Sequence, residues 1–215
     1  MTALETRFKR LLSSLGCDDQ SSQHWWKVIS DSYAEPHRHY HALNHLANMF
    51  ELLDQADLDG HSRVAVALAI FFHDLVYDAK RKDNEMRSAE LFNQFAADLS
   101  LERHLINRVC LFIEATIAHA VPAQVHDAHL TLFLDLDLSI LGMPPEVYDN
   151  YALQIRQEYS HFPDDAYAAG RADVLSKFLA REALFLNESM QERFEAQARE
   201  NVMREIQALK KEPPL

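Results

Sequence analysis

The length, composition and charge of the chain favour a globular protein and argue against long nucleic acid and against a membrane as partners. Its 215 residues (24.8 kDa) are 48% hydrophobic and 25% charged, which is enough to bury one sizeable core. The net charge of −12 argues against a surface for long nucleic acid, which needs an excess of Lys and Arg. The apolar runs are shorter than the about 20 residues of a membrane span, and the N-terminus lacks the apolar segment of a signal peptide.

The cysteines and glycines exclude several kinds of site. Cys17 and Cys110 are far apart and form neither a metal-site spacing nor a disulfide framework, so we expect a reducing, cytoplasmic compartment. The four glycines are scattered, which excludes the Gly-rich phosphate loops of the dinucleotide-binding and P-loop types. The negative net charge does not exclude a local basic patch that binds one small anionic ligand.

Helical periodicity recurs along the whole chain, which is poor in the alternating β-branched runs typical of strands. Apolar residues at helical spacing predict helices over about residues 4–15, 21–33, 41–57, 64–78, 84–96, 100–119, 127–142, 145–161, 164–186 and 189–211. We therefore expect one all-α domain over residues 1–215 with roughly nine helices. Its core should cover about residues 38–160, with the C-terminal helices of residues 164–211 packed on it.

The stretch from residue 64 to residue 78, VAVALAIFFHDLVYD, predicts the central helix. Every side chain from Val64 to Phe72 is apolar, and an element that is apolar all round is normally buried on all sides. His73 and Asp74 follow directly, and a buried charge must be paired or must coordinate a metal. The pair is compatible both with a structural His–Asp contact and with a metal site.

Other candidate ligands lie before and after the central helix. His41 and His45 are four residues apart, on one helical face, and such a pair can bind a transition metal. His119 falls near a predicted helix end, where a His commonly compensates the helix dipole. Asp135 and Asp137 interrupt an apolar segment. Helical phase places Asp137 in the apolar stripe and Asp135 in a more polar one, which predicts Asp137 as the better ligand.

Together these residues resemble the HD-domain superfamily of metal-dependent phosphohydrolases, all-α proteins named for an adjacent His–Asp pair. The pattern of that family is a first His, the His–Asp pair on a core helix, and a distant Asp. His45, His73 with Asp74, and Asp137 match it in order. More closely, the chain is similar to a bacterial group of predicted HD-superfamily phosphohydrolases in the stretches RHYHALNH, FFHDLVYD, DNEMRSAE, FLDLDLSILG and YALQIRQEY.

The resemblance implies an HD-like domain with a metal site that hydrolyses a phosphoester. Two imidazoles and two carboxylates form a mixed N/O set, suited to a divalent Mn, Fe, Co, Ni, Zn or Mg ion. With no thiolate ligand and with positions left for water, such a site is catalytic rather than structural. The expected substrate is a small, nucleotide-like phosphorylated metabolite. A homodimer is compatible with this function.

The resemblance also suggests roles for residues around the metal ligands. Asp78, one turn after Asp74, is the first candidate for general acid–base catalysis, and Glu85 is the second. Tyr77 stands where some related enzymes have a Glu, so the proton-transfer group departs from the family pattern. The candidates for an additional metal or phosphate contact are His41, His119 and Asp135, and those for the substrate phosphate are Arg38, Lys80, Lys82 and Arg87.

Two other functions fit the same residues. Some HD-fold proteins hold two irons and oxidise their substrates with O₂, and His41 and His119 would supply the extra ligands. A helical module that only binds a nucleotide or a metal is the other alternative. Metal content separates the three: two irons support the oxygenase, one divalent ion supports hydrolysis, and no metal supports the binding module.

Overall fold

The computed structural model describes residues 2–210, and these residues are all-α. They form ten α-helices and one 3₁₀ helix without any strand, which confirms the all-α class and the expected number of helices. None of these helices is both long and apolar enough to cross a membrane. Two compact units, Met1–Leu134 and Asp135–Leu215, divide the chain. The single domain over residues 1–215 stays a prediction, and Lys211, expected to end the last helix, lies outside the described residues.

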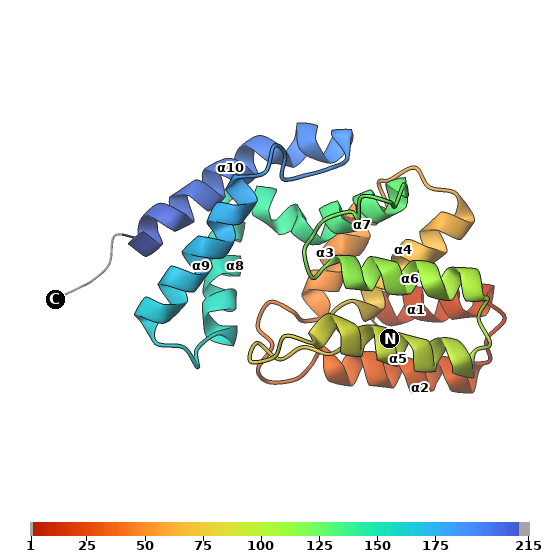
Figure 1. Cartoon of the computed structure of the whole chain (residues 1–215). Helices are drawn as coiled ribbons and strands as arrows, with labels where there is room; N and C mark the ends of the chain where they lie inside the picture. The colour runs from red at the N-terminus through yellow and green to blue at the C-terminus, as the bar shows by residue number, and fades with distance from the viewer. Residues whose placement is uncertain (1, 211–215) are drawn as a thin grey trace. The chain divides into compact units, whose positions relative to one another are not determined.

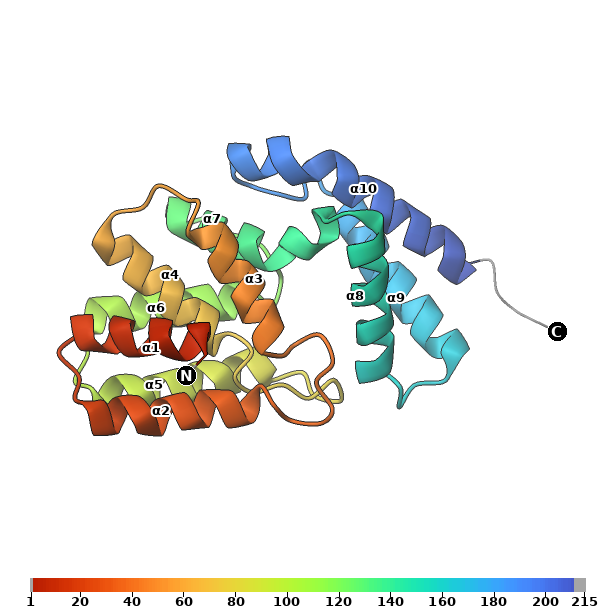
Figure 2. The same cartoon turned by 180° about the vertical axis from the view of Figure 1, so that it is seen from behind.

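The first unit is built around one apolar helix. Six helices lie entirely within it: α1 (Ala3–Ser14), α2 (Asp19–Ser32), α3 (Leu43–Leu53), α4 (Gly60–Phe72), α5 (Asn84–Asp98) and α6 (Arg103–Ala115). Helices α1, α2, α5 and α6 run alongside one another in both views (Figures 1 and 2). The boundary between the units falls inside α7 (Ala128–Leu138).

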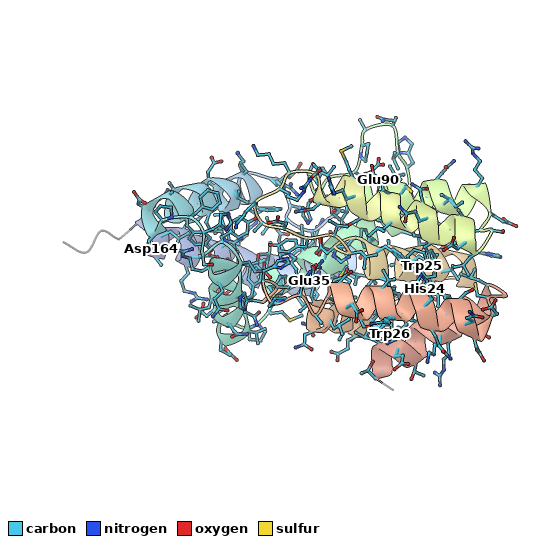
Figure 3. The ribbon with its side chains drawn as sticks, turned by 90° about the horizontal axis from the view of Figure 1, so that it is seen from below. His24, Trp25, Trp26, Glu35, Glu90 and Asp164 are labelled. Atoms are coloured by element: carbon cyan, nitrogen blue, oxygen red, sulfur yellow. The ribbon has the colours of Figure 1, made fainter. Side chains whose placement is uncertain are left out.

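Aromatic side chains hold the helices of the first unit to the buried α4. Phe71 of α4 contacts Phe8 of α1 edge to face, with ring centroids 5.0 Å apart, and Phe50 of α3 at 4.7 Å. Phe72 contacts Trp25 of α2, labelled in Figure 3, at 6.2 Å. Such pairs add about 0.5–1.5 kcal/mol each beyond the apolar area that they bury. The two residues before His73 are therefore held from several sides.

Three helix ends differ from the sequence-based expectation, and each bears on a candidate ligand. Helix α4 ends at Phe72, so His73 is its C-cap and Asp74 lies in the turn that follows. Helix α3 begins only at Leu43, so His41 precedes it. Helix α6 ends at Ala115, and His119 lies beyond it with a φ of 44°. Hydrogen bonds from the backbone N–H of one residue to the carbonyl three before it tighten the turns after α4 and α6 and end both helices.

Asp127 stabilises the start of α7 through its ionised carboxylate. Its oxygens accept hydrogen bonds from Arg108 Nε at 2.8 Å and from the backbone N–H of His129 at 2.9 Å. Burial alone would raise the pKa of Asp127, but these donors and the N–H of Leu130 lower it to about 2.

We expect Asp127→Asn to lower the unfolding midpoint near pH 6 but much less near pH 2. The folded-state pKa of about 2 lies below the unfolded value of 3.8, so the carboxylate stabilises the folded state above about pH 4. This contribution is lost as the pH falls from about 4 towards 2. Thermal unfolding of both proteins at the two pH values measures the gap, and a gap that stays constant would contradict the assignment.

The second unit is a smaller helical layer on the C-terminal side of the boundary. It contains η1 (Ser139–Gly142), α8 (Pro145–Glu158), α9 (Asp164–Leu179) and α10 (Glu188–Lys210), the last of which packs on α9 and η1. Buried Asn201 of α10 donates to the carbonyls of Leu141 and Met143 at 2.9 and 2.8 Å. Arg171 of α9 donates through Nε to Glu205 Oε1 of α10 at 2.9 Å.

We expect Gly142→Ala to destabilise the second unit by about 1–3 kcal/mol, the usual cost of overpacking. A Cβ atom at Gly142 would lie 2.5 Å from Phe194 Cβ and 2.7 Å from the Phe194 carbonyl oxygen. The backbone of α10 would therefore have to move. Gly170→Ala is the matched control, because a Cβ atom there meets nothing within 4 Å and Ala favours the helix interior. Equal stability of the two variants in urea unfolding would refute the close contact.

Candidate metal centre

The first element of the centre is His45, in the first turn of α3. The sequence places Leu46, Met49, Phe50 and Leu53 on the buried side of this helix, and their burial fixes its orientation. His45 is on the same side and is only 3% exposed. An imidazole among these apolar residues needs a polar partner.

The second element is the His73–Asp74 pair at the end of α4. The Nδ1 atom of His73 lies 3.0 Å from the carbonyl oxygen of Ile70, so Nδ1 carries the proton and donates it there. This leaves the Nε2 atom of His73 with a lone pair. A metal-ligating His typically has its other nitrogen bonded in this way, which sets its tautomer and its orientation.

The ligand atoms of these residues converge. His73 Nε2 lies 3.2 Å from His45 Nε2 and 3.1 Å from Asp74 Oδ2. Ligands about 2.1 Å from one ion stand roughly 3.0–3.4 Å apart at octahedral or tetrahedral angles, so both distances suit a shared ion. Over residues 2–210, this group alone brings three His, Cys, Asp or Glu ligand atoms within 4.8 Å of one another. His45, His73 and Asp74 thus form a group that can hold a metal ion.

His41 lies at the edge of the group. Its Nε2 atom is 4.0 Å from Asp74 Oδ2, and its ring is 6.1 Å from that of His45. The ring of Tyr77 stacks on His41 with centroids 4.2 Å apart. His119 does not belong to the His45–His73–Asp74 group. Tyr77 was noted in the sequence only as a departure from the family pattern, and its stacking role was missed because stacking leaves no spacing signal.

Arg38 has a different role from the expected phosphate contact. Its side chain is fully buried, and its guanidinium donates to the Asp74 carbonyl at 2.5 Å, to the Leu75 carbonyl at 2.9 Å and to Glu35 Oε2 at 2.9 Å. Glu35, labelled in Figure 3, lies in the connection after α2. Arg38 therefore holds the backbone of the His–Asp turn, which disfavours the expectation that it contacts a substrate phosphate, because its donors point inward.

The loop after the His–Asp pair and the start of α5 carry both proton-transfer candidates and the remaining basic candidates. Asp78 Oδ1 accepts the backbone N–H of Lys80 at 2.9 Å, while Asn84 Nδ2 donates to the Asp78 carbonyl at 3.0 Å. Asp78 thus shapes the loop while remaining half-buried. Glu85 is half-buried in the first turn of α5.

The basic candidates on this loop and on α5 differ in whether their charge is already paired. Lys80 and Lys82 are exposed. Arg87 pairs with Asp83 at 2.8 Å, and Arg81 pairs with the same carboxylate at 2.7 Å. Hydrogen bonds from Arg81 and Arg87 hold the pKa of Asp83 well below its usual range. Lys80 and Lys82 are consequently the better phosphate contacts, since the Nε donor of Arg87 is already engaged by Asp83.

The two acidic residues of α7 are buried in the reverse order to that expected. Asp135 is fully buried, and in the second unit its oxygens accept the backbone N–H groups of Leu186 at 2.9 Å and Asn187 at 2.6 Å. Burial raises the pKa of Asp135 to about 6, against the lowering effect of these donors. Asp137 is half-buried. The expected phase was wrong because α7 is apolar on nearly all sides, which leaves no polar face to recognise.

These contacts occupy Asp135 with the loop before α10, and α9 ends at Leu179, before this loop, and not near residue 186 as expected. Asp135 as an additional metal or phosphate contact is therefore disfavoured, because both of its oxygens already accept hydrogen bonds. Asp137 as the fourth ligand stays a prediction, and helical phase no longer supports it.

Comparison with known proteins adds no relative to this description. No family model, no curated protein and no solved structure matches the chain. The HD superfamily therefore stays a proposal that rests on the residues of the chain and on the geometry of the metal-ligating group.

Proposed function

We propose that the protein is a metal-dependent phosphohydrolase of the HD superfamily, acting on a phosphoester of a small, nucleotide-like metabolite. The observation that carries the proposal is the convergence of His45, His73 and Asp74 within 4.8 Å. Two nitrogens and one carboxylate oxygen best suit a divalent Mn, Fe, Co, Ni or Zn ion and leave positions for water and substrate. Asp137 is the proposed fourth ligand.

The protein contributes orientation and charge to this reaction. When bound, the ion lowers the pKa of a water molecule and polarises a phosphoryl oxygen. His73 presents Nε2 because Nδ1 is bonded to the Ile70 carbonyl, and Arg38 fixes the backbone at Asp74. Lys80 and Lys82, on the loop that follows Asp74, supply positive charge for the phosphate of the substrate.

The proposal is tested by the release of inorganic phosphate from a panel of phosphorylated metabolites. The protein is first stripped of metal with a chelator and then reloaded separately with each candidate ion. We expect phosphate release only from the reloaded protein and mainly from mononucleotide-like substrates. Release that is equally fast without metal would refute the mechanism, and no release from any substrate with any ion would favour the binding module.

We expect Asp78→Asn to keep the metal but to lose about 10²–10⁴-fold in rate, the typical contribution of a general acid–base group. The Asn side chain can still accept the N–H of Lys80, so the loop is preserved while the proton acceptor is lost. Glu85→Gln tests the second candidate in the same way, and exposed Glu90→Gln on α5 is the matched control. Full kcat in both test variants would exclude both proton-transfer roles.

One observation favours the di-iron oxygenase as a second candidate. His41 Nε2 lies 4.0 Å from Asp74 Oδ2, so a small side-chain movement would let His41 and Asp74 share another ion. Elemental analysis of the purified protein distinguishes the two functions. Two irons per chain with substrate-dependent O₂ consumption would support the oxygenase, whereas one ion per chain with phosphate release supports hydrolysis.

A further inference from the structure

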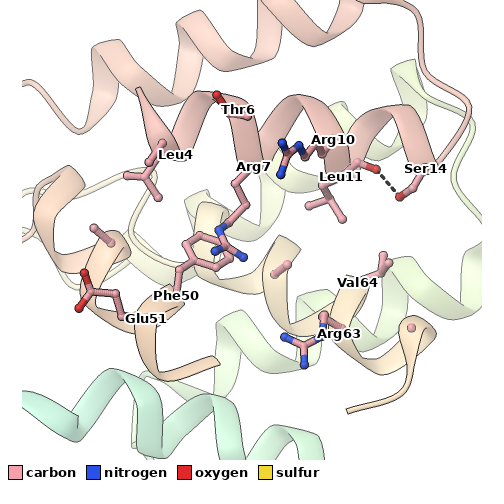
Figure 4. A pocket seen from close by; sticks show the side chains of 14 residues that line it. Leu4, Thr6, Arg7, Arg10, Leu11, Ser14, Phe50, Glu51, Arg63 and Val64 are labelled. Carbon is pink, nitrogen blue, oxygen red and sulfur yellow. Dashed lines mark hydrogen bonds between the residues drawn. The ribbon is translucent and has the colours of Figure 1, made fainter. Parts of the chain in front are cut away.

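A groove separate from the metal-ligating group lies between α1, α3 and α4 of the first unit (Figure 4). Its volume is about 640 Å³, within the roughly 300–1,000 Å³ of small-molecule sites. None of His41, His45, His73 or Asp74 lines it.

The floor of the groove is apolar. Leu4 and Leu11 of α1 face it from one side, Phe50 of α3 from another, and Val64 and Ala67 come from the first half of α4. Leu11 and Val64 are half-buried, so part of their apolar surface faces the opening. An apolar group of a ligand placed there would remove this surface from water.

Three arginines surround the apolar floor, which is unusual in a chain with a net charge of −12. Arg7 donates through Nη1 to Asp54 Oδ1 at 2.9 Å, and its guanidinium lies over the Phe50 ring, 4.7 Å from the centroid. Arg63 donates to the carbonyls of Leu53 and Ala56 at 3.1 and 2.8 Å. In Figure 4, Arg7 and Arg10 extend from α1, and Arg63 lies across the groove on α4.

Arg10 is the arginine that remains available to a ligand. Its side chain is exposed, and no hydrogen bond or ion pair joins it to another residue in the part of the chain that the structure describes. The groove and its ion pair contain three arginines against two carboxylates, Glu51 and Asp54, which leaves one positive charge. A single negative charge on a ligand would balance it.

We propose that this groove binds a small monoanionic amphiphile, a carboxylate joined to an apolar chain or ring. The apolar part lies on the floor between α1 and α4, and the carboxylate accepts hydrogen bonds from the Arg10 guanidinium. The fork of donors on Arg matches a carboxylate in a bidentate fashion, as the Arg7–Asp54 pair already does at the edge of the groove. A dianionic phosphate would exceed the one uncompensated charge.

Isothermal titration calorimetry of the full chain with sodium octanoate tests the proposal. Two comparison ligands separate its parts: 1-octanol has the apolar chain without the charge, and inorganic phosphate has charge without the chain. We expect octanoate to bind at one site per chain and at least tenfold more tightly than either comparison ligand. Equal affinity for octanol, tighter binding of phosphate, or no binding of octanoate would overturn the proposal.

The variant Arg10→Gln, with Arg103→Gln as the matched control, assigns the binding to the groove. Both arginines are exposed, but Arg103 lies at the start of α6 and does not line the groove. Loss of a charge-assisted hydrogen bond should weaken octanoate binding by at least about tenfold in Arg10→Gln and leave it unchanged in Arg103→Gln. Circular dichroism and metal binding should match the parent protein in both variants. Unchanged octanoate affinity in Arg10→Gln would overturn the proposed site.

Discussion

His73→Ala is expected to abolish metal binding and, with it, the proposed release of phosphate. His73 Nε2 is close to both other ligand atoms, 3.2 Å from His45 Nε2 and 3.1 Å from Asp74 Oδ2. Its removal would leave only two of the three converging ligands. Metal content after dialysis and the affinity for Co²⁺ or Mn²⁺ by calorimetry measure the loss, which should exceed the 10–100-fold caused by changing a residue that merely orients a ligand.

Controls separate this effect from a loss of folding. His73 is buried, so His73→Gln accompanies His73→Ala as a variant that fills more of the space. His61→Ala changes an exposed histidine near the start of the same helix and should keep the metal. Folded His73 variants that still bind one ion with the parent affinity would show that His45, His73 and Asp74 are a structural cluster.

Arg38→Met is expected to destabilise the first unit by on the order of 3 kcal/mol, because buried carbonyl groups would lose their hydrogen-bond donors. Arg38 donates to the carbonyls of both Asp74 and Leu75, and its side chain is fully buried. Its cation also lies over the rings of Tyr33 and Tyr77, at 5.0 and 5.6 Å. We further expect metal affinity to fall about 10–100-fold, because the turn that orients Asp74 would loosen.

Urea unfolding and metal titration of the same samples measure both effects. Arg38→Lys should recover only a little stability, since one ammonium group cannot reproduce the planar fork of donors. Arg87→Met removes an exposed arginine of an ion pair and should cost less than about 1 kcal/mol. If Arg38→Met kept full stability and only raised KM, Arg38 would be a phosphate contact after all, and its buried hydrogen bonds would have no energetic role.

The sequence by itself determined the helical class and three members of the candidate site. Unbroken apolarity from Val64 to Phe72 predicts a buried element, and the His–Asp pair follows it directly, so His73 was expected to be buried, as it is. The apolar stripe of α3 likewise fixes the side on which His45 lies. Both signals are local, because hydrophobic period and position along a helix do not depend on distant residues.

Tertiary structure decided which polar groups are engaged and which remain available. Asp135 accepts N–H groups that lie more than 50 residues farther along the chain, and Arg38 reaches carbonyls 36 and 37 residues away. A charged side chain can face solvent or satisfy a distant backbone group, and its sequence neighbours do not distinguish the two. The groove with Arg7, Arg10 and Arg63 was not predicted for the same reason, since it exists only where α1, α3 and α4 meet.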